Sequence, residues 1–125
     1  MGTNDIGRGA SAEQVEANMK EIAARVRAKG MQISAATIIP RQSLVPGAAD
    51  AGWGADKNAI RRKVNDWIRN AAGFDAVLDF DRVMTSAGDP DRINPAYHCG
   101  DGVHPAPIGY FEMGKSVDLG IFGAR

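Results

Sequence analysis

The fold is decided by the stretch QISAATII at residues 32–39, which is followed directly by Pro40. This stretch is rich in β-branched and small residues, which fit the pleated surface of a sheet. Apolar side chains fall on both of its faces, as is typical of a strand at the centre of a parallel sheet. We therefore predict a buried strand over residues 32–39 that ends at Pro40.

A helix is predicted before this strand. Ser11 and Gln14 have the spacing of a capping box, in which each side chain satisfies a free amide of the first helical turn. Gly30 is expected to end the helix as a left-handed cap. Apolar residues recur between them at intervals of four, three and four, which predicts one buried stripe of Val15, Met19, Ile22 and Val26.

The segments after the strand repeat this alternation. A second helix is predicted at about residues 56–72, a second short strand at residues 76–80, and a last helix from Pro107 to about Phe122. Gly73 ends the second helix, whose inner face is predicted to hold Ile60, Val64, Trp67, Ile68 and Ala71. The last helix follows a long polar loop and is predicted to turn inward Ile108, Phe111, Val117 and Ile121.

The order of these elements predicts parallel strands joined by crossover helices, so the fold class is α/β. The sequence shows no repeat and no linker. Residues 1–125 are therefore interpreted as one domain or a piece of one.

The composition excludes several functional classes. The chain is 44% hydrophobic, and its 15 acidic residues balance its 15 basic ones, which gives no electrostatic reason to expect a nucleic-acid partner or an anionic membrane surface. No apolar run approaches the roughly 20 residues that a membrane span needs. The first residues show no secretory signal, but this leaves the compartment open if the true N-terminus is missing.

Cys99 is the only cysteine, which excludes an internal disulfide and a zinc site built of cysteines. His98, Cys99 and His104 form an irregular set without a fourth ligand, so we interpret them as loop residues and expect no metal or other cofactor.

Reactive side chains are concentrated in two places, Gly2-Thr3-Asn4-Asp5 and Asp101-Gly102-Val103-His104-Pro105. Both are predicted to lie where α/β folds keep their ligand crevice, near the carboxyl ends of the strands. An aspartate three residues before a histidine can fold back onto the imidazole, fix its tautomer and stabilise the imidazolium. An asparagine amide nearby can donate a hydrogen bond to a developing oxyanion. Either motif alone is more often an ordinary turn, but the two together indicate a site.

These paired motifs resemble the later part of the SGNH (GDSL-type) serine hydrolases over nearly the whole chain. Gly2-Thr3-Asn4-Asp5 is similar to the third sequence block of that family, and Asp101-Gly102-Val103-His104-Pro105 with Gly109-Tyr110 and Met113-Gly114 is similar to the fifth. The resemblance implies a three-layer α/β/α sandwich with a five-stranded parallel sheet. It also implies that Asn4 is an oxyanion donor, Asp101 the orienting acid and His104 the general base.

The chain departs from the family pattern at its start. The Gly-Asp-Ser block that carries the nucleophile is absent, and so is the glycine of the second block. Met1 is interpreted either as an internal strand residue taken for an initiator or as the start of a truncated chain. None of the remaining serines lies in a nucleophile motif, although Ser43 is placed in a loop that could face the cleft.

Other conspicuous residues have structural interpretations. Trp67 is predicted to be a core residue, and Arg61, Arg62 and Lys63 are predicted to form the solvated side of their helix. Trp53 lies between two glycines after the first strand and is either a packed loop residue or part of a pocket for an acyl or sugar group. With Gly2 and Thr3 it forms the predicted substrate-binding set.

The leading hypothesis is a carboxylic-ester hydrolase that forms a serine ester with a small acyl ester or an acetylated carbohydrate, without metal or cofactor. The alternatives are a catalytically inactive α/β remnant that binds or assembles, and a hydrolase whose water is activated directly by His104. Because a strand that should precede Gly2 is missing, the strand at residues 32–39 is expected to keep an unpaired edge. We therefore expect self-association through that edge.

Overall fold

The structure is a computed structural model of the chain, and it describes residues 2–42 and 53–123. Two parallel strands, β1 and β2, pair with Ser34 opposite Ala76 and Ala36 opposite Leu78. In chain order the described elements are α1 (Thr3–Gly7), α2 (Ala12–Arg27), β1 (Ser34–Ala36), α3 (Ala55–Asn70), β2 (Ala76–Leu78), α4 (Phe80–Met84), β3 (Thr85–Ser86), β4 (Asp89–Ile93), α5 (Pro107–Lys115) and a 3-10 turn (Leu119–Phe122).

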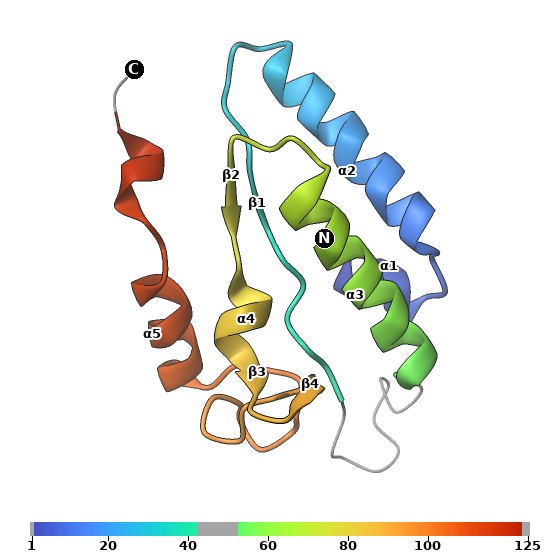
Figure 1. Cartoon of the computed structure of the whole chain (residues 1–125), viewed down its shortest axis with the longest axis vertical. Coiled ribbons are helices and arrows are strands. Elements are labelled where there is room, and N and C mark those ends of the chain that lie inside the picture. Colours follow the sequence, from blue (N-terminus) through green and yellow to red (C-terminus); the bar gives the residue numbers. More distant parts are fainter. Residues whose placement is uncertain (1, 43–52, 124–125) are drawn as a thin grey trace.

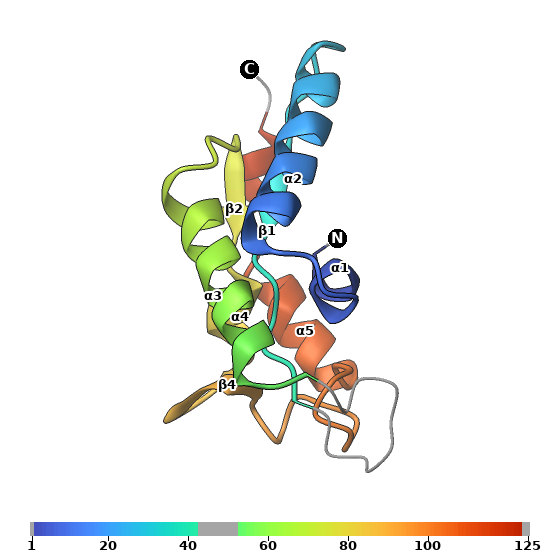
Figure 2. The same ribbon diagram turned by 90° about the vertical axis from the view of Figure 1, so that its right-hand side faces the viewer.

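The elements form layers around the small sheet. Helices α2 and α3 lie on one side of β1 and β2, and α5 lies on the other side (Figure 1). The view turned by 90° shows α2 and α3 in front of the strands and α5 behind them (Figure 2). The predicted α/β class with parallel strands and covering helices is therefore confirmed.

Helix α2 begins as predicted. The Ser11 hydroxyl accepts a hydrogen bond from the Gln14 amide, and the Gln14 side chain accepts one from the Ser11 amide. Gly30 follows the helix with a φ of +69°. The apolar stripe is only partly covered, because Val15 is buried whereas Ile22 is 37% exposed. The predicted burial of Ile22 was wrong, because this residue lines an open groove beside β1.

Helices α1, α2 and α3 enclose the main core on their side of the sheet. The buried residues of this core are Ile6, Ala12, Val15, Ile38, Trp53, Val64 and Ile68. Trp67 packs against its edge and makes an edge-to-face contact with Phe74, with ring centroids 5.8 Å apart. The prediction for the inner face of α3 holds for Val64 and Ile68, but Ala71 is exposed because the helix ends at Asn70.

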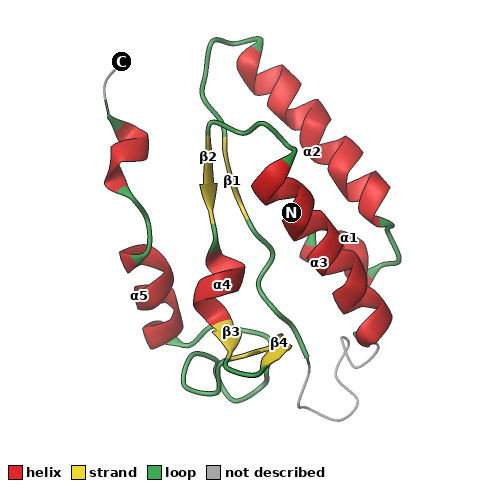
Figure 3. Cartoon of the chain, viewed as in Figure 1, coloured by secondary structure: helices red, strands yellow, loops and turns green. Residues whose placement is uncertain are grey.

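Both strands are shorter than the sequence predicts. The amide of Thr37 still donates to the Leu78 carbonyl at 3.0 Å, but the backbone of Ile38 turns to a side chain of α3. β2 ends at Leu78 because the Asp79 side chain accepts the Arg82 amide and caps α4. The segment predicted as a loop after residue 80 therefore contains α4 and the antiparallel β3–β4 hairpin. Figure 3 shows this hairpin and the loop before α5 at the end of the sheet where β1 and β2 finish.

Helix α5 presents a different face from the one predicted. Ile108 is 47% and Phe111 62% exposed, so their inward placement was wrong. Gly109 is the buried residue of α5, and a Cβ atom there would lie 2.3 Å from the Tyr97 carbonyl oxygen. The helix thus docks by close backbone approach, which only glycine permits, and Ile108, Tyr110 and Phe111 face outward. The predicted end at Phe122 was also wrong, since α5 stops at Lys115 and a separate 3-10 turn follows.

The second edge of β1 faces an open groove. Among the described residues only β2 pairs with β1. A separate finding is that no described helix is long and apolar enough to cross a membrane. The groove has a volume of about 400 Å³. Its lining is largely apolar and consists of Thr3, Met19, Ile22, residues 33–39, Phe74, Phe80 and Met113.

Candidate active site

Asp101 and His104 form a hydrogen-bonded pair in the loop before α5. Asp101 Oδ2 lies 2.6 Å from His104 Nδ1. The other carboxylate oxygen accepts the backbone amides of Val103 at 2.8 Å and His104 at 2.9 Å. The carboxylate therefore folds back over its own turn, and three donors fix its orientation when Nδ1 carries the proton.

The loop that carries this pair is closed by its own backbone. The Cys99 amide donates to the His104 carbonyl at 2.9 Å, and the Ala106 amide donates to the Tyr97 carbonyl at 2.8 Å. His98 Nδ1 accepts the amides of Gly100 and Gly102, at 2.9 and 3.2 Å. His98 thus organises the turn. Within the described residues, no group of three or more His, Cys, Asp or Glu side chains could hold a metal ion.

The hydrogen bonds to Asp101 hold the pKa of its carboxyl group well below the usual range. The backbone amide of His104 makes the largest contribution, followed by the His104 side chain and the amide of Val103. Each contact favours the charged form of the carboxyl group. Asp101 is therefore an anion at neutral pH, held against one edge of the imidazole.

We expect the Asp101 carboxyl group to remain mostly ionised in the folded protein at about pH 3.9, where an ordinary aspartate is half protonated. Because folding lowers this pKa, the stabilisation is fully present above the unfolded-state pKa and is lost as the pH falls through the folded-state pKa. A carbon-13 NMR titration of the carboxyl signals measures the midpoint. A folded-state midpoint at or above the ordinary aspartate value would contradict the expectation.

Asn4 reaches the site from α1. The chain enters this helix through Gly2, which has a φ of +97° and whose amide donates to Asp5 Oδ2 at 2.8 Å. A Cβ atom on Gly2 would lie 2.5 Å from Ile38 Cδ1, so this position needs glycine both for its conformation and for its packing. Asn4 itself is exposed.

A cavity of about 390 Å³ brings Asn4 and His104 together. The described residues that line it are Asn4, Gly7, Arg8, Arg41, Trp53, Lys57 and His104. Gly2 and Thr3, predicted to bind substrate, do not line it: Gly2 is buried against Ile38, and Thr3 lines the groove along β1. Ser43 lies outside the described residues.

Trp53 forms the apolar part of the cavity and also belongs to the core. It is 5% exposed, and its indole Nε1 donates to Asn58 Oδ1 at 3.0 Å. The guanidinium of Arg41 lies 5.2 Å from the ring centroid, a cation–π distance. The sequence hypothesis placed Trp53 either in loop packing or in a pocket, and the structure gives it both positions.

Sequence reasoning missed the three cationic residues of the cavity, Arg8, Arg41 and Lys57. Each lies in or next to a segment that the sequence analysis did identify. Arg8 comes directly after α1, Arg41 follows Pro40, and Lys57 is in the first turn of α3. Their positions near the predicted crevice were the available signal. Lys57 Nζ also donates to the Gly7 carbonyl at 3.1 Å and ties α3 to α1.

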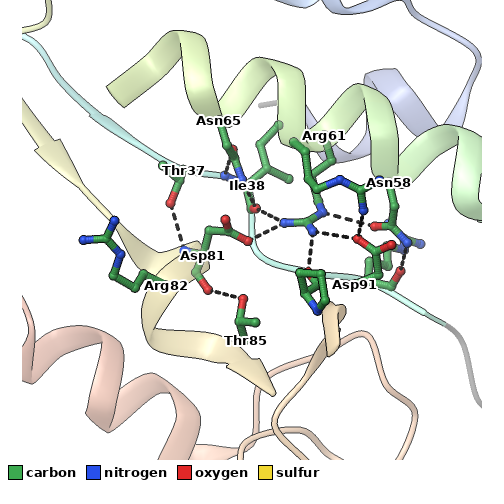
Figure 4. Close-up of polar contacts among 12 residues, drawn as sticks. Thr37, Ile38, Asn58, Arg61, Asn65, Asp81, Arg82, Thr85 and Asp91 are labelled. Carbon is green, nitrogen blue, oxygen red and sulfur yellow. Dashed lines mark hydrogen bonds and ion pairs between the residues drawn. The ribbon is translucent and has the colours of Figure 1, made fainter. Parts of the chain in front are cut away.

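Arg61 is linked to the cavity through Asn58, and its position differs from the predicted one. It was predicted to lie on the solvated side of α3, but it is 0% exposed. Its polar contacts are drawn in Figure 4. Its Nε donates to Asn58 Oδ1 at 3.1 Å, the same oxygen that holds Trp53. The other guanidinium nitrogens bind the Ile38 carbonyl, Asp81, the Pro90 carbonyl and Asp91.

These contacts explain the burial of Arg61. A guanidinium offers five N–H donors in a fixed plane. Here it is surrounded by acceptors from α3, α4, β4 and Ile38, which follows β1. Arg62 and Lys63 were also predicted to be solvated, and their side chains are 43% and 60% exposed. The structure thus divides three consecutive basic residues into one buried and two surface residues.

The extension of β1 is also held next to the histidine loop. Asn65 Oδ1 accepts the Ile38 amide at 2.7 Å, and Asn65 Nδ2 donates to the Ile38 carbonyl at 2.8 Å. Farther along, the Gln42 amide donates to the Gly102 carbonyl at 3.2 Å. Residues 38–42 therefore connect the core of α3 to the loop that carries Asp101 and His104.

Comparison with known proteins gives this arrangement a family. The chain is similar to a GDSL-like lipase from Bacteroides thetaiotaomicron VPI-5482, with 21% identity and a TM-score of 0.78 over 96% of this chain and 58% of that one. It is also similar to a candidate acylhydrolase from Bacteroides fragilis NCTC 9343, with 22% identity and a TM-score of 0.72 over 96% of this chain and 57% of that one. At such identities the likeness shows the fold, and the chain spans less than three fifths of either structure.

No curated protein is significantly similar to the chain in sequence. The model of the GDSL-like lipase/acylhydrolase family, however, matches residues 1–110 of the 125. The chain therefore belongs to the GDSL-like lipase/acylhydrolase family.

Proposed function

We propose that the protein is a carboxylic-ester hydrolase that works by acyl transfer on a small acyl ester or an acetylated carbohydrate. The observation that carries the proposal is the Asp101–His104 pair beside a cavity that Asn4 also lines. Membership of a lipase and acylhydrolase family supports ester hydrolysis as the reaction class.

The three residues take the roles that their chemistry allows. His104 is the general base, because Asp101 occupies Nδ1 and leaves Nε2 to take a proton. Asp101 is the anion that fixes the tautomer and stabilises the imidazolium. The side-chain amide of Asn4 donates a hydrogen bond to the oxyanion of the tetrahedral intermediate. Trp53 offers a small apolar surface to the substrate, and Gly2 holds the start of α1, which carries Thr3 and Asn4.

The nucleophile of this reaction is not among the described residues that line the cavity, none of which is a serine. In serine hydrolases the acceleration that survives loss of a triad member comes from the oxyanion hole and from substrate binding. We therefore expect the 125-residue chain alone to hydrolyse short p-nitrophenyl esters at most weakly.

The rates of His104→Ala, Asn4→Ala and the surface control Lys29→Ala test these roles. General acid–base catalysis typically contributes about 10²-fold or more, so His104→Ala is expected to fall to background. Asn4→Ala is expected to lose rate as well, and Lys29→Ala is expected to retain it. A rate that His104→Ala leaves unchanged would contradict the proposed site. Strong turnover that a serine-directed fluorophosphonate abolishes would contradict the expected weakness, and mapping the label would test Ser43.

A non-catalytic binding or assembly module is the second candidate, favoured by the lack of a serine in the described lining of the cavity. It predicts ligand binding without any His104-dependent turnover. A third mechanism, in which His104 activates water directly, predicts weak turnover that depends on His104 and resists the fluorophosphonate. The variants therefore separate a catalytic site from a binding module, and the fluorophosphonate then separates a serine ester mechanism from direct activation of water.

A further inference from the structure

The described residues that line the cavity beside His104 carry an excess of positive charge. Among these described residues, Arg8, Arg41 and Lys57 are cationic and none carries a carboxylate. The nearest acidic group of the proposed machinery, Asp101, is occupied by His104 and by two backbone amides. The chain as a whole has no net charge, so this concentration of positive charge is local.

Two of these cations, Arg8 and Lys57, form no ion pair within residues 2–42 and 53–123, whereas most basic residues of the protein do. Lys57 Nζ donates to the Gly7 carbonyl. Most of the other basic side chains are paired with carboxylates: Lys20, Arg25, Arg27, Arg61, Arg62, Lys63, Arg69, Arg82, Arg92 and Lys115.

The cavity also offers an apolar surface next to these charges. Trp53 lines the cavity with the small part of its side chain that is exposed, Arg41 lies over its ring at 5.2 Å from the centroid, and Asn58 accepts the hydrogen bond of its indole N–H. A ligand that fits such a surface has a short hydrocarbon portion and an anionic end. Concave sites lined by an aromatic residue and a few placed charges are the usual form of small-ligand sites.

We propose that this cavity selects esters that carry an anionic group, a carboxylate or a phosphate, which Arg8 and Lys57 bind while the hydrocarbon portion lies on Trp53. The proposal rests on the proposed ester hydrolase function and adds its substrate class. The ester carbonyl lies toward Asn4 and His104, and the anionic end lies toward Arg8 and Lys57. Attraction of this kind weakens as salt screens the charges.

Binding can be measured by NMR without turnover. The protein has only two tryptophans, so their two indole N–H signals are easily told apart. The indole N–H signal of Trp53 reports on the cavity, and that of Trp67, which packs against Phe74, reports on the fold elsewhere. The probes are monomethyl glutarate, its neutral analogue dimethyl glutarate, and inorganic phosphate. Nitrogen-15 NMR titrations of each probe at low and high salt give the affinities.

Monomethyl glutarate is expected to shift the Trp53 signal saturably, and dimethyl glutarate is expected to bind about tenfold more weakly or not at all. Arg8→Gln and Lys57→Gln are each expected to weaken the anionic probe about tenfold, with Trp67 unshifted to show an intact fold. Lys29→Gln, which removes an exposed charge away from the cavity, is the matched control and is expected to bind like the unmodified protein.

Equal binding of the neutral and anionic esters would overturn the proposal, as would a Trp53 signal that no probe moves. Phosphate binding without ester binding would overturn it as well, because it would identify a site for the free anion. Charge-selective binding in a protein whose weak hydrolysis does not depend on His104 would instead contradict the proposed function and leave the anion preference standing.

Discussion

Replacement of Arg61 with alanine is expected to lower the free energy of unfolding by about 3–5 kcal/mol, the usual cost of removing one partner from a buried charge network. Arg61 is 0% exposed and donates to Asp81 and Asp91 as well as to two carbonyls. Without it, Asp81, whose side chain is 14% exposed, keeps a charge whose main partners are Arg69 and solvent. A loss of this size is a large part of the total stability of a domain.

The matched control is Arg62→Ala, one position along the same helix. Arg62 contacts Asp91 from a 43% exposed side chain, and surface pairs of this kind contribute about 0–1 kcal/mol. Urea denaturation followed by tryptophan fluorescence gives both values. Arg61→Lys keeps the charge but cannot reach all of the acceptors at once, so it is expected to lie between the two. Equal losses for Arg61→Ala and Arg62→Ala would show that the network is not a source of stability.

The second large effect concerns association. We propose that the 125-residue chain self-associates through the edge of β1 that β2 leaves free. Among the described residues that edge has no strand beside it, and the groove next to it is lined by apolar side chains. Exposed strand edges pair with other chains, and an apolar groove adds to the gain from pairing. Light scattering at micromolar concentration is expected to show dimers or larger species.

Ser34→Lys provides the test, because Ser34 lies in β1 and is exposed, and an edge lysine opposes strand addition. Ser116→Lys adds the same charge just after α5 and is the control for general repulsion. Association that falls in Ser34→Lys and persists in Ser116→Lys supports pairing at β1. A monomer at all concentrations, or an equal effect of both substitutions, contradicts it.

Local sequence signals predicted those parts of the structure that depend on neighbours in the chain. The cap at Ser11, the left-handed glycine at Gly30 and the alternation of helices with parallel strands all follow from short-range patterns. The fold-back of Asp101 onto His104 belongs to the same class, because three residues separate the two side chains.

Features that depend on distant segments were not predictable in this way. The sequence predicts a surface position for Arg61, because all of its acceptors except Asn58 come from segments 20 to 30 positions away. The outward face of α5 has a similar origin, since Gly109 approaches Tyr97 closely and thereby sets the rotation of the helix. The cationic lining of the cavity likewise combines α1, α3 and the end of β1, three segments that no single window of sequence contains.

The side-chain amide of Asn65 pairs with the backbone of Ile38 just beyond the end of β1. Beyond β1 the backbone changes partners in succession, from Leu78 at Thr37, to Asn65 at Ile38, to Gly102 at Gln42. Only a side chain with both a donor and an acceptor can replace a neighbouring strand at Ile38, so neither a carboxylate nor a hydrocarbon could substitute for it. A residue in the middle of a covering helix thus determines where the polypeptide leaves the sheet, and through Gly102 its influence extends to the loop of the histidine.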